Sequence, residues 1–193
     1  MILHRILPLL LAAFVLAASH IHAAKPALGK QPNIILVITD DQGHGPVGRH
    51  GHPWIQTPSL DKLYDTSTRF DRFLVSPTCS PTRAAIMTGK YPARLMLTEW
   101  LPSGRWNTKA KLRSGRFLRA LPLEEVTLAE ALRKADYSTC IAGKWQLQGG
   151  FEGPHKFGFD EYCLWQLTRR PCRYPNPGVE VNGKEIDYTK GEY

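Results

Sequence analysis

The pattern of apolar and polar positions divides this chain of 193 residues into short segments with strand-like or helical spacing. Residues 33–39 (NIILVIT) form a nearly continuous apolar run, which is typical of a strand buried on both faces of a parallel sheet. Residues 69–75 alternate and form a candidate second strand. Residues 138–142 predict a third, short strand that leads into residues 143–145 (GKW).

Helical spacing and capping signals occur between these runs. A short helix is predicted to start at residues 57–58, where proline occupies the first turn. A second starts at residues 80–81, with serine as the cap and Gly89 as its end. The strongest helical pattern covers residues 127–135, where Thr127 begins a capping box. Strands alternating with helices predict an α/β fold, with a mostly parallel sheet flanked by helices.

The two ends of the chain differ from this central pattern. Residues 1–24 combine one early positive charge, a short apolar run and small residues, and we expect them to be a cleaved signal peptide. Residues 25–193 then form one domain, in which residues 150–193 lose periodicity and read as loops. No later segment is long and apolar enough for a membrane span. The mature protein is therefore expected to be exported, either periplasmic or extracellular.

The chain is basic, with 25 Lys and Arg residues against 17 Asp and Glu residues. This excess favours anionic partners without selecting one class. Residues 105–119 contain several basic and no acidic side chains, which is consistent with a solvated loop or with attraction of a sulfated glycan. Stacking aromatics and a nucleic-acid-binding motif are not evident, so we expect no nucleic-acid partner.

The four cysteines are Cys79, Cys140, Cys163 and Cys172. Their spacings match no zinc pattern. Cys140 lies in an apolar run and is expected to be a buried thiol. Cys163 and Cys172 could form a disulfide across a loop, which export would permit.

Residues 79–90 (CSPTRAAIMTGK) carry the most specific motif. This segment resembles the sulfatase signature, C-x-P-[ST]-R followed by a short helix and T-G, and the resemblance extends from about residue 32 to about residue 160. In that family the cysteine is oxidised to formylglycine by a formylglycine-generating enzyme. The resemblance therefore implies that Cys79 becomes the nucleophile in the hydrolysis of sulfate esters.

The predicted position of Cys79 is consistent with this chemistry. A hydrated aldehyde has two hydroxyls, so that one can attack the sulfur and the other can later expel the sulfate. Cys79 directly precedes a predicted helix N-terminus, which favours anions, and Arg83 lies in the first helical turn.

Asp40 and Asp41 follow the first apolar run. They resemble the paired acids that open the domain of sulfatases and bind a divalent cation, usually Ca²⁺, together with the modified cysteine. The resemblance thus assigns Asp40, Asp41 and Cys79 to a metal site. A hard cation would relieve the repulsion between two adjacent carboxylates, whereas an Asp-Asp pair alone is usually a solvated turn.

Residues 142–147 (AGKWQL) resemble the family's G-K-W-H-L segment. The resemblance assigns Lys144 to the sulfate group. Gln146 departs from the pattern because many members have His at this position, and glutamine cannot transfer protons near neutral pH. If the family's His orients a hydroxyl, Gln146 could replace it; if it transfers a proton, the rate or its pH profile should change.

Sulfatases are usually much longer than this chain, and their second half supplies further metal and sulfate ligands. We therefore expect a truncated domain with little or no activity alone. Two alternatives stay open: a phosphoesterase or phosphonate hydrolase with the same nucleophile, and a non-catalytic remnant that binds sulfated glycans. The identity of the sulfate ester is not indicated by the sequence.

Overall fold

A computed structural model describes residues 31–101, 111–112, 115–165 and 177–188 of the chain. The chain divides into two units, Met1–Ile38 and Thr39–Tyr193. The predicted signal peptide lies outside the described residues. Within the described parts, no helix combines the length and apolar character that crossing a membrane requires.

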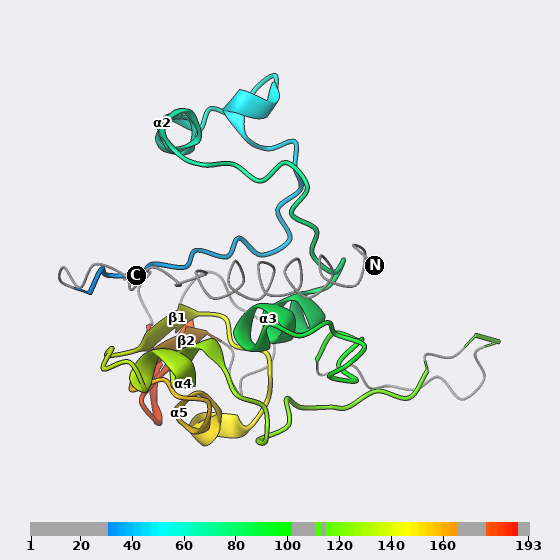
Figure 1. Cartoon of the computed structure of the whole chain (residues 1–193), viewed down its shortest axis with the longest axis vertical. Helices are drawn as coiled ribbons and strands as arrows, with labels where there is room; N and C mark the ends of the chain where they lie inside the picture. The colour runs from blue at the N-terminus through cyan, green and yellow to red at the C-terminus, as the bar shows by residue number, and fades with distance from the viewer. Residues whose placement is uncertain (1–30, 102–110, 113–114, 166–176, 189–193) are drawn as a thin grey trace, which may run out of the picture. The chain divides into compact units, whose positions relative to one another are not determined.

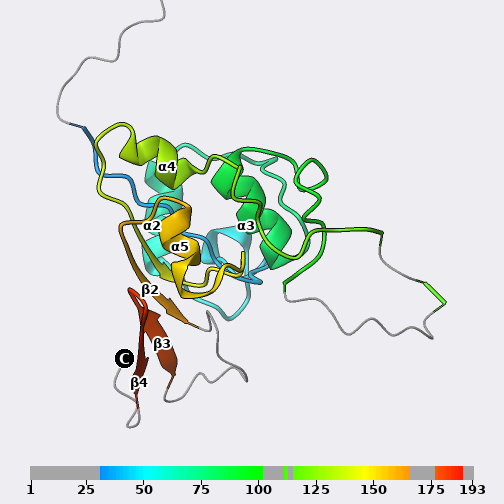
Figure 2. The same cartoon turned by 90° about the horizontal axis from the view of Figure 1, so that it is seen from below.

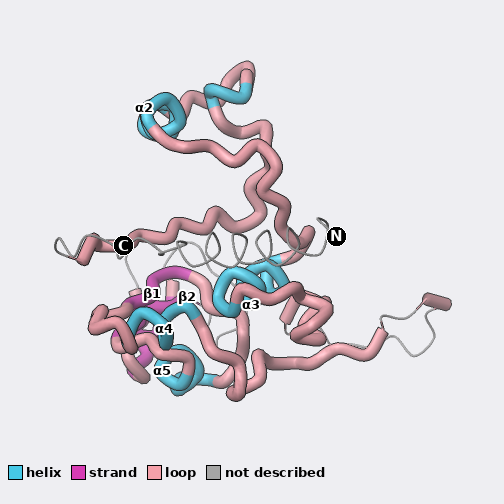
Figure 3. Tube along the Cα trace, in the orientation of Figure 1, coloured by secondary structure: helices cyan, strands magenta, loops and turns pink. Residues whose placement is uncertain are grey.

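The described part of the first unit, residues 31–38, is an extended segment without helix or strand and has the loop colour in Figure 3. The prediction of a buried strand at residues 33–39 is therefore wrong for this structure. The side chains of Ile35 and Val37 are 86% and 77% exposed. An apolar run indicates that a segment prefers burial, but a strand also needs a hydrogen-bonded neighbour along its backbone.

The second unit contains the predicted helices. Helix α2 covers Pro58–Thr66, α3 covers Cys79–Thr88, and α4 covers Leu128–Arg133 (Figure 1). Gly89 ends α3 in a left-handed conformation, as predicted. The capping box of α4 is formed by Thr127 and Glu130, which confirms that prediction as well.

The sheet contains four strands in the order β1-β2-β3-β4. Their bounds are Cys140–Gly143, Glu161–Trp165, Gly178–Val181 and Lys184–Asp187. Strands β1 and β2 are parallel. Strand β3 pairs antiparallel with both β2 and β4, and these three strands are labelled in Figure 2. The α/β class is confirmed, and the described sheet is mixed.

Residues 150–193 contain more regular structure than predicted. The short helices η2 (Gly150–Glu152) and α5 (Gly153–Lys156) precede β2, and β3 and β4 form a hairpin. The turn of that hairpin is Asn182-Gly183, with positive φ at both residues. Asn-Gly is the dipeptide preferred in two-residue hairpin turns. Among the described residues 150–165 and 177–188, the prediction of loops is therefore wrong where these helices and strands form.

The candidate strand at residues 69–75 is also absent. The segment forms turns and loop, with Phe73 and Leu74 71% and 90% exposed. As at residues 33–39, the side-chain pattern is present but no described strand pairs with this backbone.

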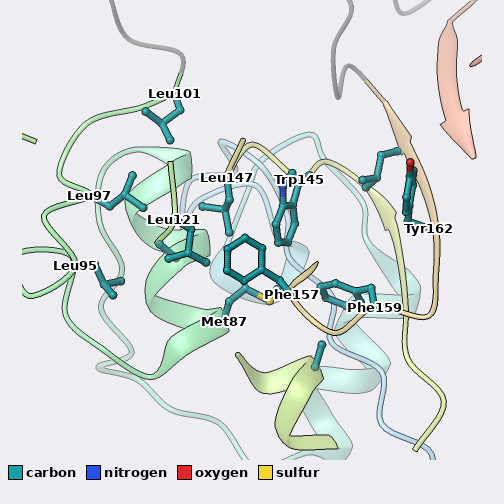
Figure 4. Packing of buried hydrophobic residues seen from close by; sticks show 13 residues of the cluster. Met87, Leu95, Leu97, Leu101, Leu121, Trp145, Leu147, Phe157, Phe159 and Tyr162 are labelled. Atoms are coloured by element: carbon teal, nitrogen blue, oxygen red, sulfur yellow. The ribbon is translucent and has the colours of Figure 1, made fainter. Parts of the chain in front are cut away.

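The hydrophobic core lies between α3, α4, the segment around Leu97 and the buried face of β2 (Figure 4). Trp145 is at its centre, with ring centroids 5.7 Å from Phe157 and 6.0 Å from Phe159. Tyr162 and Leu164 point from β2 into the same cluster, as alternation in a strand requires.

The opposite face of β1 and β2 is exposed, which corrects the expectation for Cys140. This thiol is exposed rather than buried, as is Cys163. Parallel strands are usually covered on both faces, but the described residues cover only one here. Cys172 lies outside the described residues, but the thiol of Cys163 is free in the structure, which contradicts the disulfide predicted for it.

Candidate functional site

Three of the predicted site residues meet at one carboxylate. The Nζ atom of Lys144 lies 2.5 Å from Oδ2 of Asp40, and Nη2 of Arg83 lies 3.2 Å from Oδ1. Asp40 follows the extended segment, Arg83 is on α3, and Lys144 follows the last residue of β1. Segments separated by 104 and 43 positions are thus joined by two ion pairs.

The two cations determine the protonation of Asp40. Partial burial raises the pKa of its carboxyl, but hydrogen bonds from Lys144 and Arg83, together with their positive charges, lower this pKa by a larger amount. The net pKa lies below the usual range, so Asp40 is ionised at neutral pH.

Arg83 is buried, and its guanidinium joins two other segments of the site. Its Nη2 contacts Asp40, and its Nη1 donates to the carbonyl oxygen of Lys144 at 2.6 Å. Its Nε is buried and has no hydrogen-bond partner in the described structure. Burying such a donor without a partner is costly, which makes this nitrogen a candidate contact for an anion.

Cys79 is the first residue of α3 and is half-buried with a free thiol. Thr78 occupies the cap position instead of Ser80, so the cap lies two residues earlier than predicted. Cys79 and Arg83 are four positions apart and therefore share a face of the helix. Free backbone N–H groups at this end of α3 favour negative charge beside Cys79.

Ser80, Gln146 and the backbone of Leu101 form a second, uncharged group of contacts. The hydroxyl of Ser80 donates to the carbonyl of Gln146 at 3.0 Å and accepts from the N–H of Leu101 at 2.9 Å. The side-chain amide of Gln146 donates to the carbonyl of Leu101 at 2.6 Å. Gln146 is therefore joined to the residue that follows Cys79.

Asp41 does not join these contacts. Its backbone has φ 55°, its residue is exposed, and within the described structure its side chain makes no hydrogen bond or ion pair. The two neighbouring acids thus differ, because only Asp40 contacts basic side chains.

The described residues fit a divalent cation in donor type but not in donor number. Carboxylate oxygens suit Ca²⁺, which takes about six to eight oxygen ligands. Both oxygens of Asp40 already contact basic side chains. Among the described residues, no group of three or more His, Cys, Asp or Glu side chains could hold a metal ion. Asp40 and Asp41 can supply only part of a ligand set.

The sequence did not indicate the roles of Ser80 and Leu101. The sequence predicts Ser80 as a helix cap, whereas its hydroxyl donates to the carbonyl of Gln146. Its position inside a specific motif is the only sequence signal for such a role. Leu101 contributes only backbone atoms, which any residue could supply, so no sequence signal marks it. Most of the basic stretch at residues 105–119 lies outside the described residues.

This chain is similar to known proteins of one family. The family model described as Sulfatase matches residues 32–187. Human arylsulfatase A is 40% identical over 160 residues, which cover 78% of this chain and 29% of that protein. Human steryl-sulfatase is 40% identical over 186 residues, which cover 92% of this chain and 30% of that protein.

Two solved structures are also similar. The crystal structure of Ps i-CgsB superposes with a TM-score of 0.67 at 30% identity, covering 84% of this chain and 38% of that one. A protein solved in complex with its substrate, D-glucosamine-2-N,6-O-disulfate, has a TM-score of 0.62 at 26% identity, covering 82% of this chain and 28% of that one.

The chain thus spans about a third of the length of these relatives. The match to the family model nevertheless covers most of the chain, and it contains Asp40, the helix that begins at Cys79, and Lys144. This chain belongs to the sulfatase family.

Proposed function

We propose that these residues form the nucleophile-bearing part of an enzyme that hydrolyses sulfate esters. The observation that carries the proposal is the cluster of Asp40, Arg83 and Lys144 at the helix that begins with Cys79. A sulfate ester needs positive charge around its oxygens and a nucleophile in line with its sulfur. The side chains of Arg83 and Lys144 would supply the positive charge, and Cys79 would supply the nucleophile.

Cys79 is proposed to act after conversion to formylglycine by a formylglycine-generating enzyme. The hydrated aldehyde would supply a hydroxyl nucleophile and a second hydroxyl for the release of sulfate. The chain's own contribution is to hold that group at the start of α3, where free N–H groups and the side chain of Arg83 favour an oxyanion.

Lys144 and Arg83 are proposed to stabilise the sulfate oxygens. Both are held beside an ionised carboxylate, which keeps their positive charges at one place. The unpartnered Nε of Arg83 is a donor available to an anion. Gln146 is proposed to contribute a hydrogen bond rather than proton transfer.

Asp40 and Asp41 are proposed to contribute carboxylate oxygens to one divalent cation, Ca²⁺ in the simplest case. The cation would polarise the sulfate group. Because the described ligands are too few, we propose that the remaining ligands come from the part of the sulfatase domain that the relatives have and these residues do not include. The chain alone should then have little or no activity.

The substrate is proposed to be a sulfated aryl compound, sterol or glycan, as the names of the relatives suggest for those proteins. Export through the predicted signal peptide at residues 1–24, to a periplasmic or extracellular location, belongs to the same proposal. A related phosphoesterase would use the same nucleophile, so comparing aryl sulfate with aryl phosphate turnover separates the two activities.

The first test is a mass spectrum of the peptide that contains Cys79, after production in a host with the modifying enzyme. We expect the mass loss that accompanies conversion of the thiol to an aldehyde. The substitution Cys140→Ala removes an exposed thiol on the sheet and should not change this result, whereas Cys79→Ala abolishes it. An intact thiol at Cys79 would contradict the proposal.

The second test compares aryl sulfate turnover by this chain with turnover by a version extended with the downstream sequence of a sulfatase. We expect turnover only in the extended protein and its loss in Cys79→Ala but not in Cys140→Ala. Equal activity of the short and extended proteins would show that the cation ligands are not missing. Retained glycan binding without turnover in the extended protein would favour the non-catalytic alternative.

A further inference from the structure

We propose that Ser80 and Gln146 are positioning residues, which together hold the start of α3 and the segment of Lys144 against the backbone of Leu101. The inference rests on the proposed function only for its catalytic consequence. Its structural part concerns where Cys79 is held, and this can be tested without any enzymatic turnover.

The junction begins at Ser80, which is completely buried. Its hydroxyl both donates, to the carbonyl of Gln146, and accepts, from the N–H of Leu101. A buried hydroxyl that uses both functions fixes its neighbours more strictly than one that makes a single bond, because losing it leaves two backbone groups without a partner.

Gln146 completes the junction from the other side. Its Nε2 donates to the carbonyl of Leu101, so both backbone groups of Leu101 are bound by two side chains. Leu101 is itself completely buried, at one end of the core cluster (Figure 4). The junction therefore joins three segments that are distant in sequence.

Arg83 provides a second link between the same two segments. Ser80 and Arg83 are three positions apart on α3, and they donate to the carbonyls of Gln146 and Lys144, which are two positions apart. Two side chains on one helix face thus bind alternate carbonyls of one segment. Two such bonds fix the orientation of the segment as well as its distance.

The backbone of Gln146 supports this interpretation. Its φ of 55° is uncommon for a residue with a side chain, and such conformations persist where surrounding contacts hold them. Its Oε1 is buried and has no partner in the described structure. This oxygen is therefore an acceptor available to a further group.

The catalytic consequence follows from proximity. Cys79 directly precedes Ser80, and Lys144 lies two positions before Gln146. The junction therefore determines the distance between the nucleophile at Cys79 and the side chain of Lys144. A displacement of about 1 Å can lower a rate about a hundredfold. Neither residue needs to contact the substrate for this effect.

The test measures how fast iodoacetamide alkylates Cys79 in the unmodified full chain at one fixed pH, by quantitative peptide mass spectrometry. The exposed thiols of Cys140 and Cys163 serve as internal references in the same molecules. In Ser80→Ala we expect the rate at Cys79, divided by the rate at Cys140, to rise by about fivefold or more, because local opening of the helix start becomes easier.

A matched control distinguishes positioning from loss of stability. The hydroxyl of Thr127 is also buried, donates to the carbonyl of Phe157 at 2.6 Å and accepts from the N–H of Glu130 at 3.2 Å. Thr127→Val therefore removes the same two kinds of bond away from Cys79. It should leave the ratio of rates within about twofold, since stability lost at another place does not act locally.

Two further variants complete the experiment. Gln146→Met removes only the bond to Leu101 and should raise the ratio in the same direction, which covers the case that Ser80→Ala does not fold. Ser80→Thr keeps the hydroxyl and should restore most of the wild-type ratio. The inference is overturned if the ratio stays unchanged in Ser80→Ala and Gln146→Met, or if Thr127→Val raises it as much. Neither result depends on whether the protein hydrolyses sulfate esters.

Discussion

Replacing Arg83 with methionine should destabilise the second unit more than an equivalent change at the surface. The side chain is buried, and its Nη1 bond to the carbonyl of Lys144 is short at 2.6 Å. Losing a hydrogen bond from a charged donor costs about 1.5–3 kcal/mol. The bond to Asp40, whose side chain is 36% exposed, adds only about 0–1 kcal/mol because water screens it.

The two losses together cost about 1.5–4 kcal/mol, and removal of the unpartnered Nε offsets part of this, so the expected total is about 1–3 kcal/mol. Urea unfolding followed by tryptophan fluorescence measures it, since Trp145 lies in the core. With a slope of about 2 kcal/mol per molar, the midpoint should fall by about 0.5–1.5 M.

Arg133→Met is the matched control for this substitution. Arg133 also forms an ion pair, with Nε 3.1 Å from Oδ1 of Asp160, but its side chain is 50% exposed, whereas that of Arg83 is 9% exposed. Its loss should cost at most about 1 kcal/mol. If Arg83→Met and Arg133→Met had equal cost, the argument that burial makes the contacts of Arg83 strong would be refuted.

Three other outcomes are expected from the structure. Gly158→Ala should destabilise by more than about 2 kcal/mol, because φ is +91° and an added Cβ would lie 2.5 Å from the backbone nitrogen of Glu130; thermal unfolding measures this. Gly183→Ala has φ +82° but open space, so the same measurement should show only about 1 kcal/mol, and equal losses would contradict the role of the close contact. The backbone N–H of Thr139 donates to Asp160 and lowers the pKa of this carboxyl in the folded state, so the resulting stabilisation is present above the unfolded pKa of about 4 and is lost as the pH falls through the folded pKa. The difference in stability between wild type and Asp160→Asn should therefore disappear in acid, and a difference that stays constant with pH would disprove the assignment.

Local signals explain which elements could be predicted from the sequence. Helix α2 has proline in its first turn, α3 ends at Gly89 and α4 has a capping box, while β1 ends at Gly143. The cap of α3 lies two residues before the predicted one because Thr78 and Ser80 are both acceptable caps, and such boundaries vary by one or two residues.

Elements that depend on distant partners could not be predicted in this way. Residues 33–39 have the composition of a buried strand, but composition does not specify which backbone would pair with them. Asn182-Gly183 is a strong hairpin signal for strands β3 and β4. The many glycines and prolines nearby favour loops instead, and the sequence prediction follows them.

The candidate site shows the same division. Asp40, Arg83 and Lys144 were predicted together because each belongs to a recognisable motif, and the structure joins them by ion pairs. The buried bonds of Ser80 and Gln146 to Leu101 could not be predicted, since they depend on how three segments pack.

The uncovered face of the sheet has a practical consequence for anyone who purifies this protein. Cys163 pairs in register with Ala142, two positions from Cys140 on the neighbouring strand, so both thiols project from one exposed surface. Without a reductant, air oxidation can join copies of the chain through intermolecular disulfides at this surface. Bands at multiples of the chain's mass on a non-reducing gel would then report on storage conditions and would be no sign of a native oligomer.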